Sequence, residues 1–480
     1  MQLNRRTAIK GALGGALVAG PFAGFANAAA LSRTGALAGA AVGTLVPVED
    51  ARDEVVRLFL PEGFHYRSFH DTSSPVELRD GTQLPGRHDG MGAFPGRNGN
   101  VLLVRNHEVN SPTPAFGPTK PYDKRGGGGT TTIEVTPDGH VVDAYTSLSG
   151  TMMNCSGGQM PWGAWVTCEE TVNGPDVGPD FTRTSNVPLQ KRHGYVFEVP
   201  AGGIAEGRPI RKAGRFAHEA VSFDPAERTL YLTEDNFAFP SGFYRYVPRK
   251  SFKGNRLDHN GQLQMLAVRG RPEAHLEARQ DTTKVYDVEW VDIDEPDFEF
   301  DHTPGEEAPT SNDTAINYVG DQGRARGAAH FSRCEGQVFH DGVVYFTATQ
   351  GGGDAMTGPD NKDGYGNGFG QVWAYDTRNA TLRCVYQSES PDVLDFPDNV
   401  TTSPRGTLVL CEDHDKGNYL RGLTPEGDLF SIARNAMAGR EDEEFAGSTF
   451  SPDGKTLFVN IQARQGLTFA IWGDWESIGV

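Results

Sequence analysis

The sequence predicts an all-β fold, a six-bladed β-propeller, and three observations support this prediction. The 480 residues include 60 Gly and 30 Pro, and so many chain-breaking residues favour short strands and tight turns over long helices. Hairpin-like segments recur along the chain, each with a carboxylate near its start and a polar residue near its end. They repeat at intervals of roughly 50 to 65 residues, which is typical of the blades of a propeller.

The clearest hairpin runs from Asp395 to Asp413. Ser403-Pro-Arg-Gly406 is a turn sequence between a Val/Thr-rich segment and the apolar run 407–410. The two ends of a hairpin return to the same edge of a sheet, so Asp398 and Asp413 are expected to lie close together. Segments with the same layout run over 219–234, 335–350, 444–460 and, more loosely, 155–170.

A single propeller domain is expected over residues 53–480, after a weakly ordered Ala/Gly-rich arm at 29–52. Short strands at 55–60 and 64–69 are expected to close the ring against the last strand, 467–472. Between about 250 and 330 the turn rhythm is lost, which predicts a loop-rich insertion over one face. The blades are expected in order at 101–145, 155–199, 219–247, 335–376, 399–433 and 445–472.

Residues 1–28 have the features of an export signal. A basic start is followed by an apolar run and by Ala26-Asn-Ala28, a small-residue cleavage site. The pair Arg5-Arg6 with Lys10 close behind favours the twin-arginine export machinery over an ordinary secretory route. No later apolar run is long enough to span a bilayer. A periplasmic or secreted protein with no membrane attachment after signal cleavage is therefore expected.

The charge of the chain argues against nucleic acid as a partner. The whole chain carries −19, and loss of residues 1–28 removes Arg5, Arg6 and Lys10 but no acid, which leaves −19 − 3 = −22. A phosphorylated small molecule is still compatible with this charge, because bound polyvalent cations reverse its sign locally.

Acidic side chains recur at comparable hairpin ends, together with one cysteine. Each blade points its first strand at the central channel, so these side chains are expected to gather at one channel mouth. Carboxylates suit calcium, and the thiolate of Cys155 suits iron or zinc. Good turn sequences alone would not explain carboxylates at the same end of four hairpins. The candidate ligands are Cys155, Glu219, Glu335, Asp398 and Glu444, with Glu108, Glu169, Glu234 and Asp413 as second choices.

Several of these candidates have an alternative interpretation. The five cysteines are odd in number and lack a Cys-x-x-Cys pair, which argues against a disulfide framework, and Cys155 is then either a ligand or core packing. Arg333 would face the same mouth as Glu335, where it either binds an oxyanion through two parallel hydrogen bonds or only neutralises the acids around it. Three interpretations are open for His107 and His218: a metal ligand, a general acid, or a buried polar residue with its hydrogen bonds satisfied.

A set of motifs spread over nearly the whole chain resembles the PhoX-type alkaline phosphatases. They are Asn106-His-Glu108, Asn154-Cys-Ser-Gly-Gly158 followed by 162–170, Gly214-Arg-Phe-Ala-His-Glu219, Arg333-Cys-Glu335, Pro397-Asp-Asn399 and Glu444-Phe-Ala-Gly447. The sequence departs from the family pattern at Cys334, where proline is usual, and at Ala463-Arg-Gln-Gly466.

The resemblance implies a propeller that holds a ferric iron pair (Fe3+) and several Ca2+ ions bridged by an oxo group and hydrolyses phosphomonoesters outside the cytoplasm. It implies that Cys155 is the iron-bound thiolate and Arg333 the phosphate clamp. It further implies that Glu219, Glu335, Asp398 and Asp413 are metal carboxylates.

The predicted function is metal-dependent hydrolysis of phosphomonoesters by an oxo or hydroxide held on the metals, in a protein expected to be a monomer. One alternative is a calcium-dependent lactonase or arylesterase, which would need carboxylates but neither the thiolate nor the arginine. The other is a non-catalytic binding propeller in which calcium is only structural.

Overall fold

The computed structural model describes residues 44–249, 257–359, 364–414 and 417–480. The predicted export signal at 1–28 and residues 29–43 of the expected arm lie outside these residues. The end of the arm, at 46–49, forms the strand β1 (Val46–Glu49) and pairs with β2 (Val56–Leu60). The prediction of a weakly ordered arm is therefore wrong for this part.

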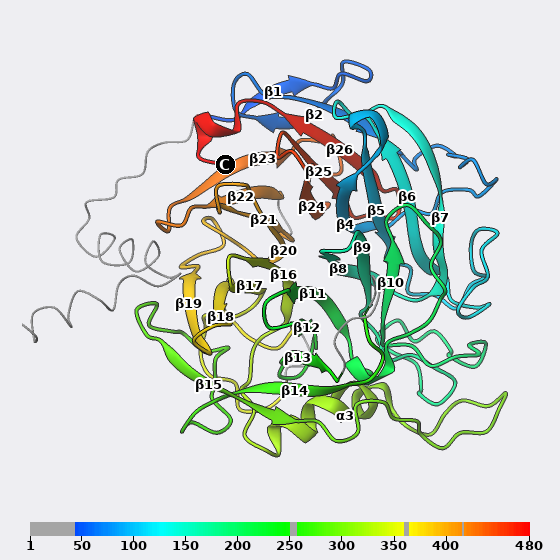
Figure 1. Cartoon of the computed structure of the whole chain (residues 1–480), viewed down its shortest axis with the longest axis vertical. Coiled ribbons are helices and arrows are strands. Elements are labelled where there is room, and N and C mark those ends of the chain that lie inside the picture. Colours follow the sequence, from blue (N-terminus) through cyan, green and yellow to red (C-terminus); the bar gives the residue numbers. More distant parts are fainter. Residues whose placement is uncertain (1–43, 250–256, 360–363, 415–416) are drawn as a thin grey trace, which may run out of the picture.

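The fold is all-β and propeller-like, with antiparallel sheets arranged around a central axis (Figure 1). One sheet contains β4 (His88–Pro95), β5 (Val101–His107), β6 (Gly128–Val135) and β7 (Val141–Thr151). The next contains β8 (Asn154–Met160), β9 (Ala164–Glu169) and β10 (Val196–Pro200).

A nine-stranded sheet follows along the chain. Its first part contains β11 (His218–Asp224), β12 (Thr229–Glu234), β13 (Phe243–Pro248) and β14 (Gly261–Val268). Its second part contains β16 (Cys334–His340), β17 (Val343–Ala348), β18 (Gln371–Asp376) and β19 (Thr381–Gln387). Strand β15 (Tyr286–Asp292) pairs with both β14 and β19 and joins the two parts.

The last two sheets combine strands from both ends of the chain. β1 and β2 extend the sheet of β20 (Pro397–Thr402), β21 (Leu408–Glu412), β22 (Tyr419–Leu423) and β23 (Leu429–Asn435). β3 (His65–Phe69) pairs with β26 (Leu467–Trp472) and completes the sheet of β24 (Phe445–Phe450) and β25 (Thr456–Ile461). The ring closure predicted for 64–69 is confirmed, whereas strand 56–60 pairs with β23 and not with the last strand.

The segment 250–330 is less loop-like than predicted. It contributes β14 and β15 to the nine-stranded sheet, so the prediction of a loop-rich insertion is wrong for these residues. It also contains α3 (Asn312–Arg324), the one α-helix among the described residues. Ser311 caps this helix by accepting a hydrogen bond from the Thr314 backbone N–H. Short 3-10 helices lie at Arg97–Gly99, Arg211–Ala213 and Trp475–Ile478.

The innermost strands form a closed ring. β4, β8, β11, β16, β20 and β24 contact one another in this order, and β24 contacts β4; Figure 1 shows them around the centre of the molecule. Neighbouring sheets cover both faces of strands such as β11 and β12, so every residue of these two strands is buried. The predicted first blade started at residue 101 and missed its innermost strand, β4.

Candidate metal centre

A one-residue β-bulge occurs near the start of each innermost strand. In β4 the register of strand pairing shifts by one residue between His88 and Met91. The same shift occurs at the equivalent place in the other innermost strands. A bulge takes a residue out of the ladder and re-aims its side chain. The side chains that directly follow the last paired residue in five of the described strands line one cavity: Asp89, Cys155, Glu219, Glu335 and Asp398.

Small residues behind these side chains let the innermost strands converge. A Cβ atom added at Gly90 would lie 2.5 Å from Cα of Ser156, and one added at Gly336 would lie 2.6 Å from Cα of Asn399. Neither position has room for a larger residue without moving backbone. The close approach brings acids from separate sheets to one axis.

The sixth innermost strand, β24, supplies no carboxylate from its bulge. Gly447 occupies the equivalent position with φ +62°, and a Cβ there would collide with the backbone carbonyl oxygen of Asp89. Glu444, one residue before β24, lines the cavity in its place.

A second set of cavity residues follows directly after the second strand of five of the six described hairpins. They are Glu108 after β5, Glu170 after β9, Asp235 after β12, Asp413 after β21 and Gln462 after β25. Asp413 donates its backbone N–H to the carbonyl oxygen of Phe396 at 3.0 Å. This bond holds the two ends of the 398–413 hairpin side by side, as the sequence predicted.

Glu169 and Glu234, by contrast, point into the walls. The carboxylate of Glu169 accepts hydrogen bonds from the backbone N–H groups of Met152, Gly194 and Tyr195 and from His193 Nδ1 at 2.6 Å. Neither glutamate lines the cavity. Side chains of a strand alternate between its faces, so a step of one residue decides which carboxylate reaches the axis.

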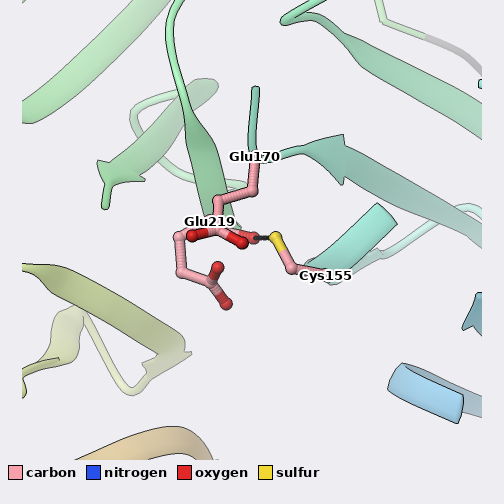
Figure 2. Close-up of side chains that lie close together, drawn as sticks. All are labelled: Cys155, Glu170 and Glu219. Atoms are coloured by element: carbon pink, nitrogen blue, oxygen red, sulfur yellow. Dashed lines mark hydrogen bonds between the residues drawn. The ribbon is translucent and has the colours of Figure 1, made fainter. Parts of the chain in front are cut away.

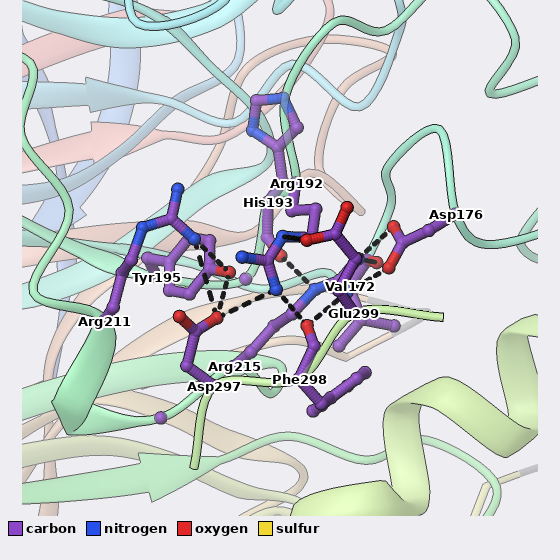
Figure 3. A network of polar contacts seen from close by, with 12 residues as sticks. Val172, Asp176, Arg192, His193, Tyr195, Arg211, Arg215, Asp297, Phe298 and Glu299 are labelled. Carbon is purple, nitrogen blue, oxygen red and sulfur yellow. Dashed lines mark hydrogen bonds and ion pairs between the residues drawn. The ribbon is translucent and has the colours of Figure 1, made fainter. Parts of the chain in front are cut away.

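His193 is the centre of a buried ion cluster behind the cavity wall. Burial alone would lower the pKa of His193, but Glu169 and Asp123 outweigh it and raise the pKa to about 9. The ring is therefore charged at neutral pH. Its backbone carbonyl oxygen accepts from Nε of Arg215, which also forms a bidentate pair with Asp176 at 2.7 and 2.8 Å (Figure 3).

Two groups of candidate ligands share Glu219. The ligand atoms of Cys155, Glu170 and Glu219 lie within 4.8 Å of one another, and Figure 2 shows the three side chains meeting. The ligand atoms of Glu219, Glu335 and Asp398 also lie within 4.8 Å of one another. The sulfur of Cys155 is 3.2 Å from the carbonyl oxygen of His218. A thiol and several carboxylates from separate sheets thus converge in a cavity of about 670 Å³.

Burial and mutual repulsion oppose the charged forms of these groups. Burial raises the pKa of the Cys155 thiol well above its usual value. Burial, followed by the charge of Asp413, raises the pKa of Asp398 to about 7. Burial, followed by the charge of a neighbouring acid, also raises the pKa values of Asp89, Glu170, Glu219, Glu335 and Glu444. Polyvalent cations would relieve this repulsion, so the donor set fits a metal centre.

Two arginines reach the cavity from strained backbone. Arg87 and Arg333 each lie two residues before a bulge carboxylate, with φ of 48° and 37°. Met153 has the same position and φ of 47°. Positive φ is unfavourable for these residues, and strained backbone of this kind clusters at functional sites. All three side chains line the cavity.

The arginines are held by the acids around them. Nη2 of Arg333 lies 2.8 Å from Asp235 and 3.0 Å from Glu335. Arg87 donates from Nε to the carboxylate and to the backbone carbonyl oxygen of Glu108, both at 2.8 Å. The positive charges of these two arginines are too few to balance the negative charges of the carboxylates that line the cavity.

The two candidate histidines do not reach the cavity. His107 contacts the carbonyl oxygen of Gly86 and the hydroxyl of Thr131. His218 contacts the carbonyl oxygen of Gly214 and packs against Phe216, with ring centres 3.6 Å apart. Burial lowers the pKa of each to about 3, so both are neutral and structural.

Known proteins share this architecture and its sequence pattern. The family model for alkaline phosphatase PhoX matches residues 44–143 and 128–464, most of the chain. The chain belongs to the PhoX alkaline phosphatase family. Phosphomonoester hydrolysis is the activity of this family.

A solved structure supports the fold of this PhoX family member. The structure of Pseudomonas fluorescens PhoX in complex with vanadate, a transition state analogue, has a TM-score of 0.61 and 17% identity. The match covers 92% of this chain and 99% of that chain. A gluconolactonase from Xanthomonas campestris has a TM-score of 0.40 and 12% identity over 84% of this chain and 97% of its own. A search of curated proteins found no match.

Four residues that line the cavity of this PhoX family member were not predicted from its sequence: Asp89, Glu170, Asp235 and Arg87. A signal for Asp89 was present, because His88-Asp-Gly90 has the layout of Cys334-Glu-Gly336. Glu170 and Asp235 each follow an acid that was chosen instead. No helix among the described residues is long and apolar enough to cross a membrane.

Proposed function

We propose that this PhoX family member hydrolyses phosphomonoesters at the acidic cavity with iron and calcium ions as cofactors. The observation that carries the proposal is the convergence of a thiol and many buried carboxylates around two arginines. A site of this kind without cations would repel a phosphate, whereas one filled with cations would attract it.

The two ligand groups suit different ions. The group of Cys155, Glu170 and Glu219 contains a sulfur donor, which favours iron. The group of Glu219, Glu335 and Asp398 offers only oxygen atoms, which favours calcium. Bound cations would supply positive charge for the phosphate oxygens and a strongly acidified water molecule.

Arg333 would bind the phosphate. Asp235 and Glu335 fix its guanidinium by contacts to Nε and Nη2, and these contacts do not involve Nη1. An arginine positioned in this way stabilises charge that gathers on phosphate oxygens in the transition state. Arg87 precedes β4, which lies across the ring of innermost strands from β16. It would add positive charge at the same cavity. No side-chain nucleophile is needed.

The same proposal covers three broader features. The nine-stranded sheet would be two blades linked by β15, which gives six blades in all, each starting at one innermost strand. The protein would be a periplasmic or secreted monomer exported by the twin-arginine route. Its substrate would be a small phosphomonoester.

The test combines metal analysis with an activity assay on one sample. Protein exported by its native host should contain both iron and calcium and should hydrolyse 4-nitrophenyl phosphate. Chelation should abolish turnover, and metal addition should restore it. Cys155→Ser should lose iron and activity together.

Other outcomes would separate the alternatives. Calcium without iron and without turnover would indicate a binding propeller. Lactone hydrolysis that survives Cys155→Ser would indicate a lactonase.

A further inference from the structure

The mouth of the acidic cavity is apolar. Phe181 and Phe237 are 79% and 49% exposed, the highest values for phenylalanine among the described residues, and both line this cavity. Pro179 and Ile316 of α3 also line it. An exposed large apolar side chain is unfavourable in water, and a group of them at a pocket marks a ligand contact.

The apolar residues and the acids occupy different depths. Cys155, Glu219 and Glu335 are buried, whereas Phe181 and Phe237 are exposed. Glu170, Asp398 and Glu444 are half-buried. A phosphate held at the acids would therefore direct its ester group toward the phenylalanines. Cζ of Arg333 lies 5.2 Å from the centre of the Phe237 ring, so this ring borders the group proposed to bind phosphate.

The charge of the mouth disfavours leaving groups with further negative charge. Asp180 and Asp313 line the cavity beside the apolar residues. The carboxylate of Asp180 is fixed by Asn110 at 2.9 Å and by Asn173 at 2.8 Å. Among the residues that the structure describes, no lysine lines the cavity, and the two arginines that line it, Arg87 and Arg333, already pair with acids.

We propose that this mouth selects phosphomonoesters whose leaving group is uncharged and apolar, such as aryl phosphates. Phe181 and Phe237 would contact the leaving group and set this specificity. The inference rests on the proposed function, because it assumes that phosphate binds at the buried acids.

The test compares two substrates that differ in the leaving group. The ratio of kcat/KM for 1-naphthyl phosphate to kcat/KM for glycerol 3-phosphate is measured with the metal-loaded enzyme. Wild type should favour the aryl ester, and Phe181→Ala should lower the ratio about tenfold, the change expected from one lost apolar contact. Phe369→Ala removes another exposed phenylalanine outside the cavity and should leave the ratio unchanged.

A binding measurement gives a readout that does not depend on turnover. Phenylphosphonate and methylphosphonate share the phosphate-like group and differ only in the apolar part. Phenylphosphonate should bind more tightly to wild type, and Phe181→Ala should remove most of the difference.

The outcomes distinguish the two levels of the proposal. An active Phe181→Ala enzyme with an unchanged ratio and unchanged phosphonate preference would overturn the specificity assignment and leave the proposed function intact. A metal-loaded wild type that hydrolyses neither ester would overturn the proposed function itself.

Discussion

At the scale of single residues, a step of one position separates a side chain that lines the cavity from one that points into its wall. Glu169 accepts three backbone hydrogen bonds and pairs with His193, whereas Glu170 lines the cavity beside Cys155. The same step separates Glu234, bonded to the Tyr244 hydroxyl, from Asp235. The acid that a sequence motif highlights is therefore not always the one that reaches the axis.

Replacing Glu170 and its neighbour Glu169 by glutamine should change the stability of the protein in opposite directions. Glu170→Gln should lower phosphatase activity by on the order of 100-fold, and it should stabilise the chelated protein because burial and Asp235 raise the pKa of Glu170. Glu169→Gln should lower the free energy of unfolding by about 2 to 4 kcal/mol, because His193 and backbone donors lose a charged partner. Denaturant unfolding and activity assays check both, and an unstable Glu170→Gln protein would contradict this assignment.

At the scale of the element, the repeated bulge turns one side chain of an innermost strand toward the cavity, and five of the six described bulges place a candidate ligand there. The bulge exposes one side chain to the axis, and the small residue behind it lets the next innermost strand approach. Glu219-Ala220 and Glu335-Gly336 show this combination, and Cys155-Ser156 extends it to the thiol. Hairpin geometry and strand packing are thus both needed for the site.

A methyl group at one of these contacts should disturb the site and the fold together. Gly336→Ala would place Cβ 2.6 Å from the backbone of Asn399, so we expect a loss of about 1 to 3 kcal/mol in unfolding free energy and lower metal content. Gly202→Ala is the matched control, because its Cβ would lie 3.7 Å from the nearest atom, Leu102 Cδ1. Thermal unfolding and elemental analysis measure both effects. Equal behaviour of the two variants would show that close strand approach does not shape the site.

At the scale of the whole molecule, closing the ring is what brings the candidate ligands together. β3, from the start of the described chain, pairs along its full length with β26 near the end. This closure fixes β24 beside β4, so Glu444 and Asp89 reach the same cavity. The carboxylates gathered in the cavity repel one another. In the metal-free protein this repulsion lowers the free energy of unfolding.

The chelated protein should therefore lose stability as pH rises. Burial and Asp413 raise the pKa of Asp398 to about 7, above the usual value near 4 of an unfolded chain. Between these values the native state holds the proton and the unfolded state does not, so unfolding free energy falls with rising pH, by on the order of 4 kcal/mol for such a group. Thermal unfolding from pH 4 to 8 should show this decline after chelation and a flatter profile with metals. A chelated protein that becomes more stable toward pH 8 would contradict it.

The sequence by itself determined the all-β class, the hairpins and many of the candidate ligands that line the cavity. Turn sequences between apolar runs locate hairpins because turn formation is local, and this is why Asp398 and Asp413 were placed together. Repetition of the pattern then placed Cys155, Glu219 and Glu335 at one axis.

Tertiary structure alone decided the rest. It selected Glu170 over Glu169 and Asp235 over Glu234, because strand register and bulges are set by pairing partners distant in the chain. It placed β14 and β15 in a sheet where the sequence showed only irregular spacing, since packing against neighbouring strands outweighs weak local preferences. It also put Phe181 and Phe237 at the mouth, where ring closure and the loop positions, not any local motif, bring them together.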